Sequence, residues 1–111
     1  MQIDRQMTGE VVVLSLEGEL DSRSAPQAQS EIAELVPQDG KIVLDLSGTT
    51  YLSSAGLRVM LLTYRQAREA GTRLVLAAVP ADVLDVMSAT GFLDFFTVSD
   101  TVQAGLGVLQ R

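Results

Sequence analysis

The sequence predicts an α/β fold in which a mixed sheet is covered by crossover helices. Apolar runs of strand length, rich in Val, Leu and Ile, alternate along the chain with amphipathic stretches at helical spacing. That alternation favours a mixed sheet over a sandwich of two sheets. The length of 111 residues is enough for one compact domain and too short for two. We therefore expect a single domain spanning residues 1–111, with about five strands and about four helices.

The first two predicted strands form an N-terminal hairpin. Residues 11–16 read Val-Val-Val-Leu-Ser-Leu, a β-branched and apolar run that predicts a strand. Residues 2–7 are more polar, and we expect them to pair with that strand at the edge of the sheet. The first helix should begin at Ser24, because Ser24 can cap it and Gln27 lies at the spacing of a capping box.

The rest of the chain continues the alternation of strands and helices. Residues 41–46 are almost continuously apolar, which is typical of a central strand covered on both faces. A polar turn follows, and a long helix is expected from Ser53 and Ser54 to a C-terminal stop at Gly71. The same signals predict the remaining elements, which are a strand over 73–79, a helix over 82–90, a strand over 95–98 and a final helix capped by Asp100.

Cysteine and histidine are both absent from the sequence, which removes several classes of site. Disulfides, thiolate and imidazole metal ligands, a cysteine nucleophile and a Ser-His-Asp triad are all excluded. Ser-Lys or carboxylate-pair chemistry survives this filter, although the chain has few lysines. We predict no catalytic residue, no metal and no cofactor. The formal charge of −6 argues against nucleic acid and anionic membrane surfaces as partners.

The sequence also lacks the marks of a targeted or membrane-inserted protein. Residues 1–9 have no apolar core of the kind that a signal peptide needs. No apolar run approaches the roughly 20 residues that span a bilayer. We therefore expect a cytoplasmic protein that does not insert into a membrane.

The turn before the long helix holds the candidate functional residues. If Ser53 is the N-cap, its hydroxyl satisfies one backbone N–H of the helix, and Ser54 is left free to face solvent. A phosphate on Ser54 would be tolerated there, because the N-terminus of a helix presents unpaired N–H groups and a positive dipole end. Gly56 costs about 1 kcal/mol relative to Ala inside a helix. That cost indicates close approach of a partner or phosphate, or else tight helix–strand packing. Ordinary capping is the simpler interpretation of the serines on residue chemistry alone.

The segment over residues 45–58, D-L-S-G-T-T-Y-L-S-S-A-G-L-R, resembles the signature of STAS domains. This family includes the anti-sigma factor antagonists and the cytoplasmic domains of sulphate transporters. Residues 18–21, G-E-L-D, resemble a family turn that lies beside the phosphorylation site, and residues 88–92 resemble a further family pattern. The likeness covers nearly the whole chain, including the order of strands and helices.

The resemblance assigns roles to individual residues. It makes Ser54 the phosphoacceptor, and it places the other candidates on the surface that binds the partner. Ser53 departs from the family, which usually has an Asp there, and the change could alter kinase recognition. Arg58 lies one turn beyond Ser54, so it could pair with a phosphate or simply remain solvated. The partner-binding candidates are Asp21, Ser53, Ala55, Gly56 and Arg58.

The function implied by the resemblance is a phosphorylation-switched anti-sigma factor antagonist. The unphosphorylated domain would bind a serine kinase that is also the anti-sigma factor, and so release a sigma factor. Phosphorylation would weaken this binding, and a phosphatase would reset it. The domain itself would catalyse nothing, because the kinase brings ATP and magnesium.

Two other functions stay open at the level of the sequence. One is a STAS subunit or scaffold without a switch, for example in a lipid-transport ATPase complex. The other is a small hydrolase or phosphotransferase that uses the serine turn. This enzyme is disfavoured, because no His, Cys or nearby Lys is present to activate Ser54.

Overall fold

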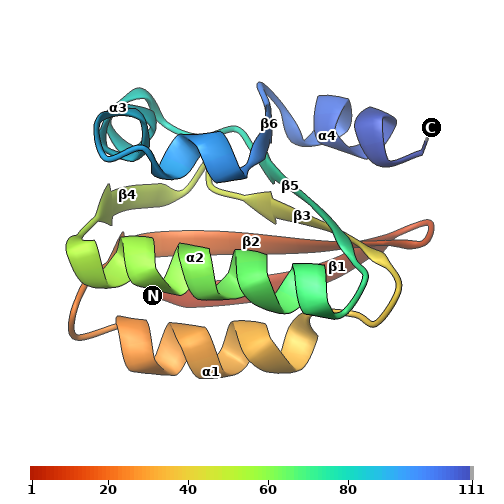
Figure 1. Ribbon diagram of the computed structural model, residues 1–111, viewed down its shortest axis with the longest axis horizontal. Helices are drawn as coiled ribbons and strands as arrows, with labels where there is room; N and C mark the ends of the chain where they lie inside the picture. The colour runs from red at the N-terminus through yellow and green to blue at the C-terminus, as the bar shows by residue number, and fades with distance from the viewer. Residues whose placement is uncertain (111) are drawn as a thin grey trace.

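The computed structural model describes residues 1–110, and its elements follow the predicted alternation of strands and helices (Figure 1). The described residues form six strands, four α-helices and one short 3₁₀ helix, η1. The strands are β1 (Gln2–Thr8), β2 (Val11–Leu20), β3 (Lys41–Asp45), β4 (Thr49–Leu52), β5 (Arg73–Ala77) and β6 (Thr97–Ser99). The helices are α1 (Ala25–Leu35), α2 (Ser54–Glu69), α3 (Ala81–Ala89), η1 (Phe92–Phe95) and α4 (Val102–Leu109).

The sheet is mixed, as the sequence predicts. Its strands lie in the order β1-β2-β3-β5-β6, with β1 antiparallel to β2 and the other neighbours parallel. A sixth strand, β4, lies off this path and pairs in parallel with the last residues of β2. Within the part of the chain that the structure describes, no helix is long and apolar enough to cross a membrane.

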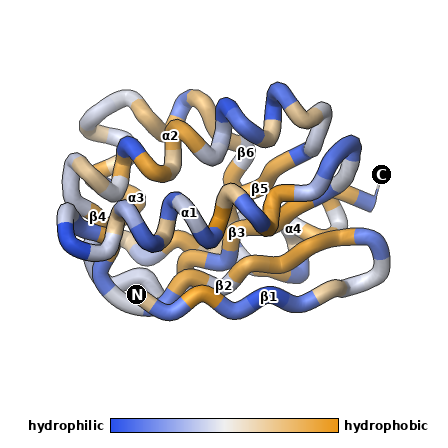
Figure 2. Tube along the Cα trace, turned by 90° about the horizontal axis from the view of Figure 1, so that it is seen from below, coloured by the Kyte–Doolittle hydropathy of each residue, from blue (hydrophilic) through white to orange (hydrophobic). Residues whose placement is uncertain are grey.

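The sheet buries apolar side chains on both faces. Along β2, Val12, Leu14 and Leu16 face the core that is shared with α1 and α2, whereas Val11 and Val13 face α4. Successive strand residues point to opposite faces, so a continuously apolar run fits a strand that is covered on both sides. Figure 1 shows α1 and α2 on one side of the sheet and α4 on the other. Figure 2 shows the same pattern as orange along β2, β3 and β5, against a mostly blue and white β1.

Three local predictions are corrected by the structure. Residues 49–52, expected to be part of a polar turn, form β4, because the extended end of β2 supplies the partner that a four-residue strand needs. Phe95 ends the helix η1, so the last strand starts at Thr97. The cap of α4 is Thr101, whose hydroxyl accepts the N–H of Ala104 at 3.0 Å. The predicted cap, Asp100, precedes the position from which a side chain can reach that N–H.

Candidate functional site

The serine turn joins β4 to α2, and Ser53 is the N-cap of this helix, as predicted. The backbone of Ser53 is extended, and its Oγ accepts the N–H of Gly56 at 3.3 Å. Its own N–H donates to the carbonyl oxygen of Leu20 at 3.0 Å. Ser53 is therefore tied both to the first turn of α2 and to the end of β2.

Ser54 is the first residue of α2, and its side chain is exposed. Its hydroxyl has no hydrogen-bond partner within residues 1–110. The backbone N–H groups of the first helical turn have no partner inside the helix, and the positive end of the helix dipole lies there. Arg58, also exposed, follows one turn later on the same face of α2. A phosphate on Ser54 would therefore sit in a favourable field and within one turn of a guanidinium group.

Gly56 is buried, which gives it the packing role that the sequence left open. A Cβ atom at this position would overlap the backbone carbonyl oxygen of Leu20 and would lie 2.8 Å from Cδ1 of Leu52. The first turn of α2 thus lies directly on the ends of β2 and β4. Ala55, in contrast, is only partly buried and borders the exposed Ser54.

A second turn, between β2 and α1, places Asp21 beside the serine turn. The Asp21 carboxylate accepts the backbone N–H groups of Ser24 and Arg23, at 3.1 and 2.9 Å. These bonds hold the pKa of Asp21 below its usual value, and the bond from the Ser24 N–H has the largest effect. The carboxylate is thus engaged in an Asx turn, the structural role that the sequence also allows. Its side chain is nevertheless only partly buried.

The capping box predicted at the start of α1 is not formed. Ser24 is the N-cap residue, but its side chain makes no capping bond to the helix. Its hydroxyl instead donates to the carbonyl oxygen of Glu19 at 2.7 Å and accepts the N–H of Asp21 at 3.0 Å. Gln27 bonds to Glu31 at 2.9 Å, one turn along the helix. These contacts fix the shape of the turn that carries Asp21.

Strand pairing brings the two turns together. In the parallel β2–β4 pair, Leu20 lies opposite Leu52, so Asp21 and Ser53 leave neighbouring strands at the same edge of the sheet. The predicted site residues are therefore grouped around the N-terminus of α2, with Gly56 beneath the surface that the others form. Within the described residues, no group of carboxylates is arranged to hold a metal ion.

Sequence reasoning missed an apolar surface next to the serine turn. Tyr51, on β4, is 52% exposed although it is large and aromatic. It borders a hollow of about 240 Å³ whose lining includes Val83 and Val86 of α3. The signal was present in the sequence as an aromatic residue two positions before the cap. Its exposure could not be read there, because it depends on how the fold places β4, in which Thr50 and Tyr51 are both exposed between the buried Thr49 and Leu52.

The fold and the site can now be compared with known proteins. The family model of the STAS domain matches residues 2–105. This chain belongs to the STAS domain family. The family predicted from residues 45–58 is thereby confirmed, and so is its mixed α/β fold.

Relatives within the family carry the name of anti-sigma factor antagonists. BtrV of Bordetella bronchiseptica, which is provisionally named an anti-sigma factor antagonist, is 37% identical to this chain over 95 residues. The matched residues are 85% of this chain and 82% of BtrV. An anti-sigma factor antagonist from Mycobacterium paratuberculosis has a similar structure, with a TM-score of 0.84 and 25% identity over 99% of this chain and 94% of its own. The phosphorylated form of SpoIIAA, a Bacillus cell fate determinant, has a TM-score of 0.69 and 22% identity, and the match covers 96% of this chain and 99% of SpoIIAA. By sequence and structure, the chain is a member of the anti-sigma factor antagonist family.

Proposed function

We propose that this STAS domain binds an anti-sigma factor that is also a serine kinase, and that phosphorylation of Ser54 weakens the binding. The observation that carries the proposal is the difference between the two serine hydroxyls. The Ser53 hydroxyl caps α2, whereas Ser54 presents an exposed hydroxyl at the first helical position. A kinase can therefore modify Ser54 without removing the cap that holds the turn in place.

The proposed contact surface surrounds Ser54. Asp21, Ser53 and Ala55 lie on the two adjoining turns, and each is at least partly accessible. Tyr51 adds a half-exposed aromatic ring beside them. Exposed aromatic residues are frequent anchors in protein interfaces, and the surrounding polar groups then set the orientation of the partner. Gly56 contributes indirectly, because its packing sets the position of the turn.

Phosphorylation would act mainly through charge. A phosphoserine carries about 1.5 to 2 negative charges at neutral pH. On this surface it would lie near the Asp21 turn, so the contact area would become more acidic and would repel the nucleotide bound in the kinase. The Ser53 position carries no carboxylate here, so the unphosphorylated site has one negative charge fewer than the usual family sequence. We therefore expect a larger relative change in charge when Ser54 is phosphorylated. A phosphatase would restore binding, and the switch would operate in the cytoplasm.

The test uses intact protein from its native host together with the kinase that co-purifies with it. Intact mass and peptide mapping should place a phosphate on Ser54. Ser54→Ala should bind the kinase like the parent and take up no phosphate, whereas Ser54→Asp should bind at least about tenfold more weakly. Ser30→Asp, on the exposed face of α1, adds the same charge at a distance from the turn and should bind like the parent.

Two results would contradict the proposal. Equal binding by Ser54→Asp and Ser54→Ala would show that charge at this position does not control the partner. An unmodified Ser54 in vivo, with stable co-purification of a transporter ATPase, would instead favour a STAS subunit that has no switch.

A further inference from the structure

The outer face of α2 concentrates positive charge in an acidic protein. Arg58, Arg65 and Arg68 are all exposed and follow Ser54 at alternating spacings of four and three, with Leu61 between them. Residues at such spacings share one face of a helix. We call the three arginines the arginine stripe. The helix holds one acidic residue, Glu69, so its net charge is +2 in a chain whose formal charge is −6.

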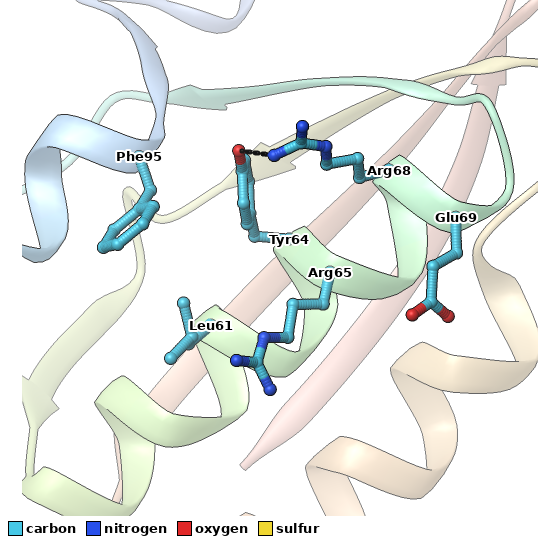
Figure 3. Close-up of a pocket in the computed structure, with 6 residues that line it drawn as sticks. All are labelled: Leu61, Tyr64, Arg65, Arg68, Glu69 and Phe95. Carbon is cyan, nitrogen blue, oxygen red and sulfur yellow. Dashed lines mark hydrogen bonds between the residues drawn. The ribbon is translucent and has the colours of Figure 1, made fainter.

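The C-terminal half of the stripe borders an open hollow. This aromatic hollow has a volume of about 630 Å³ and is lined by Leu61, Tyr64, Arg65, Arg68, Glu69 and Phe95 (Figure 3). Phe95 is 51% exposed, an unusual amount for a phenylalanine that adjoins other apolar groups. It comes from η1, so the hollow joins the middle of the chain to its C-terminal third.

Aromatic packing fixes the walls of the hollow. The Tyr64 ring lies 5.6 Å from the Phe95 ring and 5.5 Å from the Phe96 ring, centre to centre, in tilted and edge-on arrangements. Figure 3 shows Tyr64 standing between Phe95 and the side chain of Arg68, whose Nη1 lies 3.5 Å from the Tyr64 hydroxyl oxygen. A guanidinium group is therefore held beside an apolar surface that is already formed. Such a surface can bind a ligand with little loss of side-chain freedom.

We propose that the arginine stripe and the aromatic hollow bind an acidic peptide segment of a protein partner, with one aromatic side chain of that segment seated in the hollow. The ring would pack against Phe95 and Leu61, and carboxylates on the side of the ring toward Arg58 would face the arginines. The proposal does not depend on phosphorylation of Ser54 or on the identity of the kinase.

The length of the stripe favours a peptide over a smaller anion. Arg58 and Arg68 are ten residues apart on the helix, which corresponds to about 15 Å along its axis. An extended segment of about five residues spans the same length. A mononucleotide seated in the hollow would leave Arg58 unused, and Glu69 on the rim would repel its phosphates. The same Glu69 gives the peptide a direction, because carboxylates are favoured toward Arg58 and disfavoured past the hollow.

The two parts of the site should contribute differently. Pairs between exposed charges are individually weak and are screened by salt, so the stripe would mainly speed association and orient the segment. The aromatic side chain in the hollow would slow dissociation, as buried aromatic anchors do in other interfaces. Binding should therefore weaken with salt, and it should require the aromatic residue at every salt concentration.

The experiment measures fluorescence anisotropy of a labelled nine-residue peptide, made of aspartate and glutamate with one tryptophan at its end, on the full chain. Arg68→Glu and Phe95→Ala should each weaken binding at least tenfold. Arg5→Glu, on the exposed edge strand β1, changes the net charge by the same amount as Arg68→Glu and should stay within twofold of the parent. A peptide with alanine in place of tryptophan, and one with lysines in place of the acids, should each bind at least tenfold more weakly.

Amide shift mapping by NMR adds a second measurement on the folded proteins. The acidic peptide should shift the amides of Tyr64, Arg68 and Phe95, and Ser54→Ala should bind it like the parent. The proposal is overturned if the peptide fails to bind at millimolar concentration, or if Arg5→Glu weakens it as much as Arg68→Glu. It is also overturned if ATP displaces the peptide at equal concentration, which would indicate a nucleotide site. Self-association of the free protein that Arg68→Glu abolishes would instead identify a second copy as the occupant.

Discussion

Gly56→Ala tests whether the site is held in place by contact between α2 and the strand ends. Inside a helix, alanine is favoured over glycine by up to about 1 kcal/mol. On helix propensity alone, the substitution should therefore stabilise the protein. In this fold, however, the new methyl group would overlap the carbonyl oxygen of Leu20 and lie 2.8 Å from Cδ1 of Leu52.

The clash should outweigh the gain in helix propensity. The Leu20 carbonyl is part of the backbone of β2, so rotation of a side chain cannot relieve the overlap, and α2 must shift. Overpacking of this kind typically costs about 1–3 kcal/mol. Offset by the helix term, Gly56→Ala should lower the free energy of unfolding by up to about 2 kcal/mol. A melting temperature lowered by roughly 4 °C or more per kcal/mol should accompany it.

Gly107→Ala is the matched control. Gly107 lies in α4, is exposed, and has no atom within 4 Å of the position that a Cβ would take. The same change should therefore raise the stability there by up to about 1 kcal/mol. Urea unfolding followed by circular dichroism, with the m-value fitted for each variant, measures both effects. Stabilisation of both variants to the same degree would refute the packing role of Gly56.

Two further predictions concern the turns that precede α1 and α4. The pKa of Asp21 is lowered in the folded state by N–H donation from Ser24 and then Arg23, so its contribution to stability is present above the unfolded pKa and is lost as pH falls through the folded value. The advantage of the parent over Asp21→Asn in urea unfolding should therefore be larger at pH 7 than at pH 2, and an advantage independent of pH would contradict this account. Thr101→Ala removes the cap of α4 and should lower the free energy of unfolding by about 1 kcal/mol. Asp100→Ala should change it by less than about 0.5 kcal/mol in the same assay. The reverse order would show that Asp100 is the cap.

The cap of α2 shows what local sequence can predict. Ser53 was expected to bond a backbone N–H and to leave Ser54 in solvent, and the structure has both features. The prediction succeeds because a cap depends on groups that are three residues apart. At α1 the same rule failed, because the backbone of Ser24 is helical rather than extended and its hydroxyl faces the preceding turn, where it accepts the N–H of Asp21 and donates to the carbonyl of Glu19. Both serines precede a helical run, and what separates them is the backbone at the cap, which is extended at Ser53 and helical at Ser24.

The sequence by itself determined the alternation of strands and helices, the apolar core, the family and the residues of the serine turn. The alternation, the core and the serine turn depend on composition or on contacts between residues close in the chain, whereas the family was inferred from the resemblance of residues 45–58 to its signature. The tertiary structure decided that residues 49–52 are a strand, that Gly56 lies on the carbonyl of Leu20, and that Tyr51 is exposed. It also placed Phe95 beside the arginines of α2. These features need partners from distant parts of the chain, as in the bond from the Ser53 N–H to the Leu20 carbonyl, and such partners are fixed only when the sheet has formed.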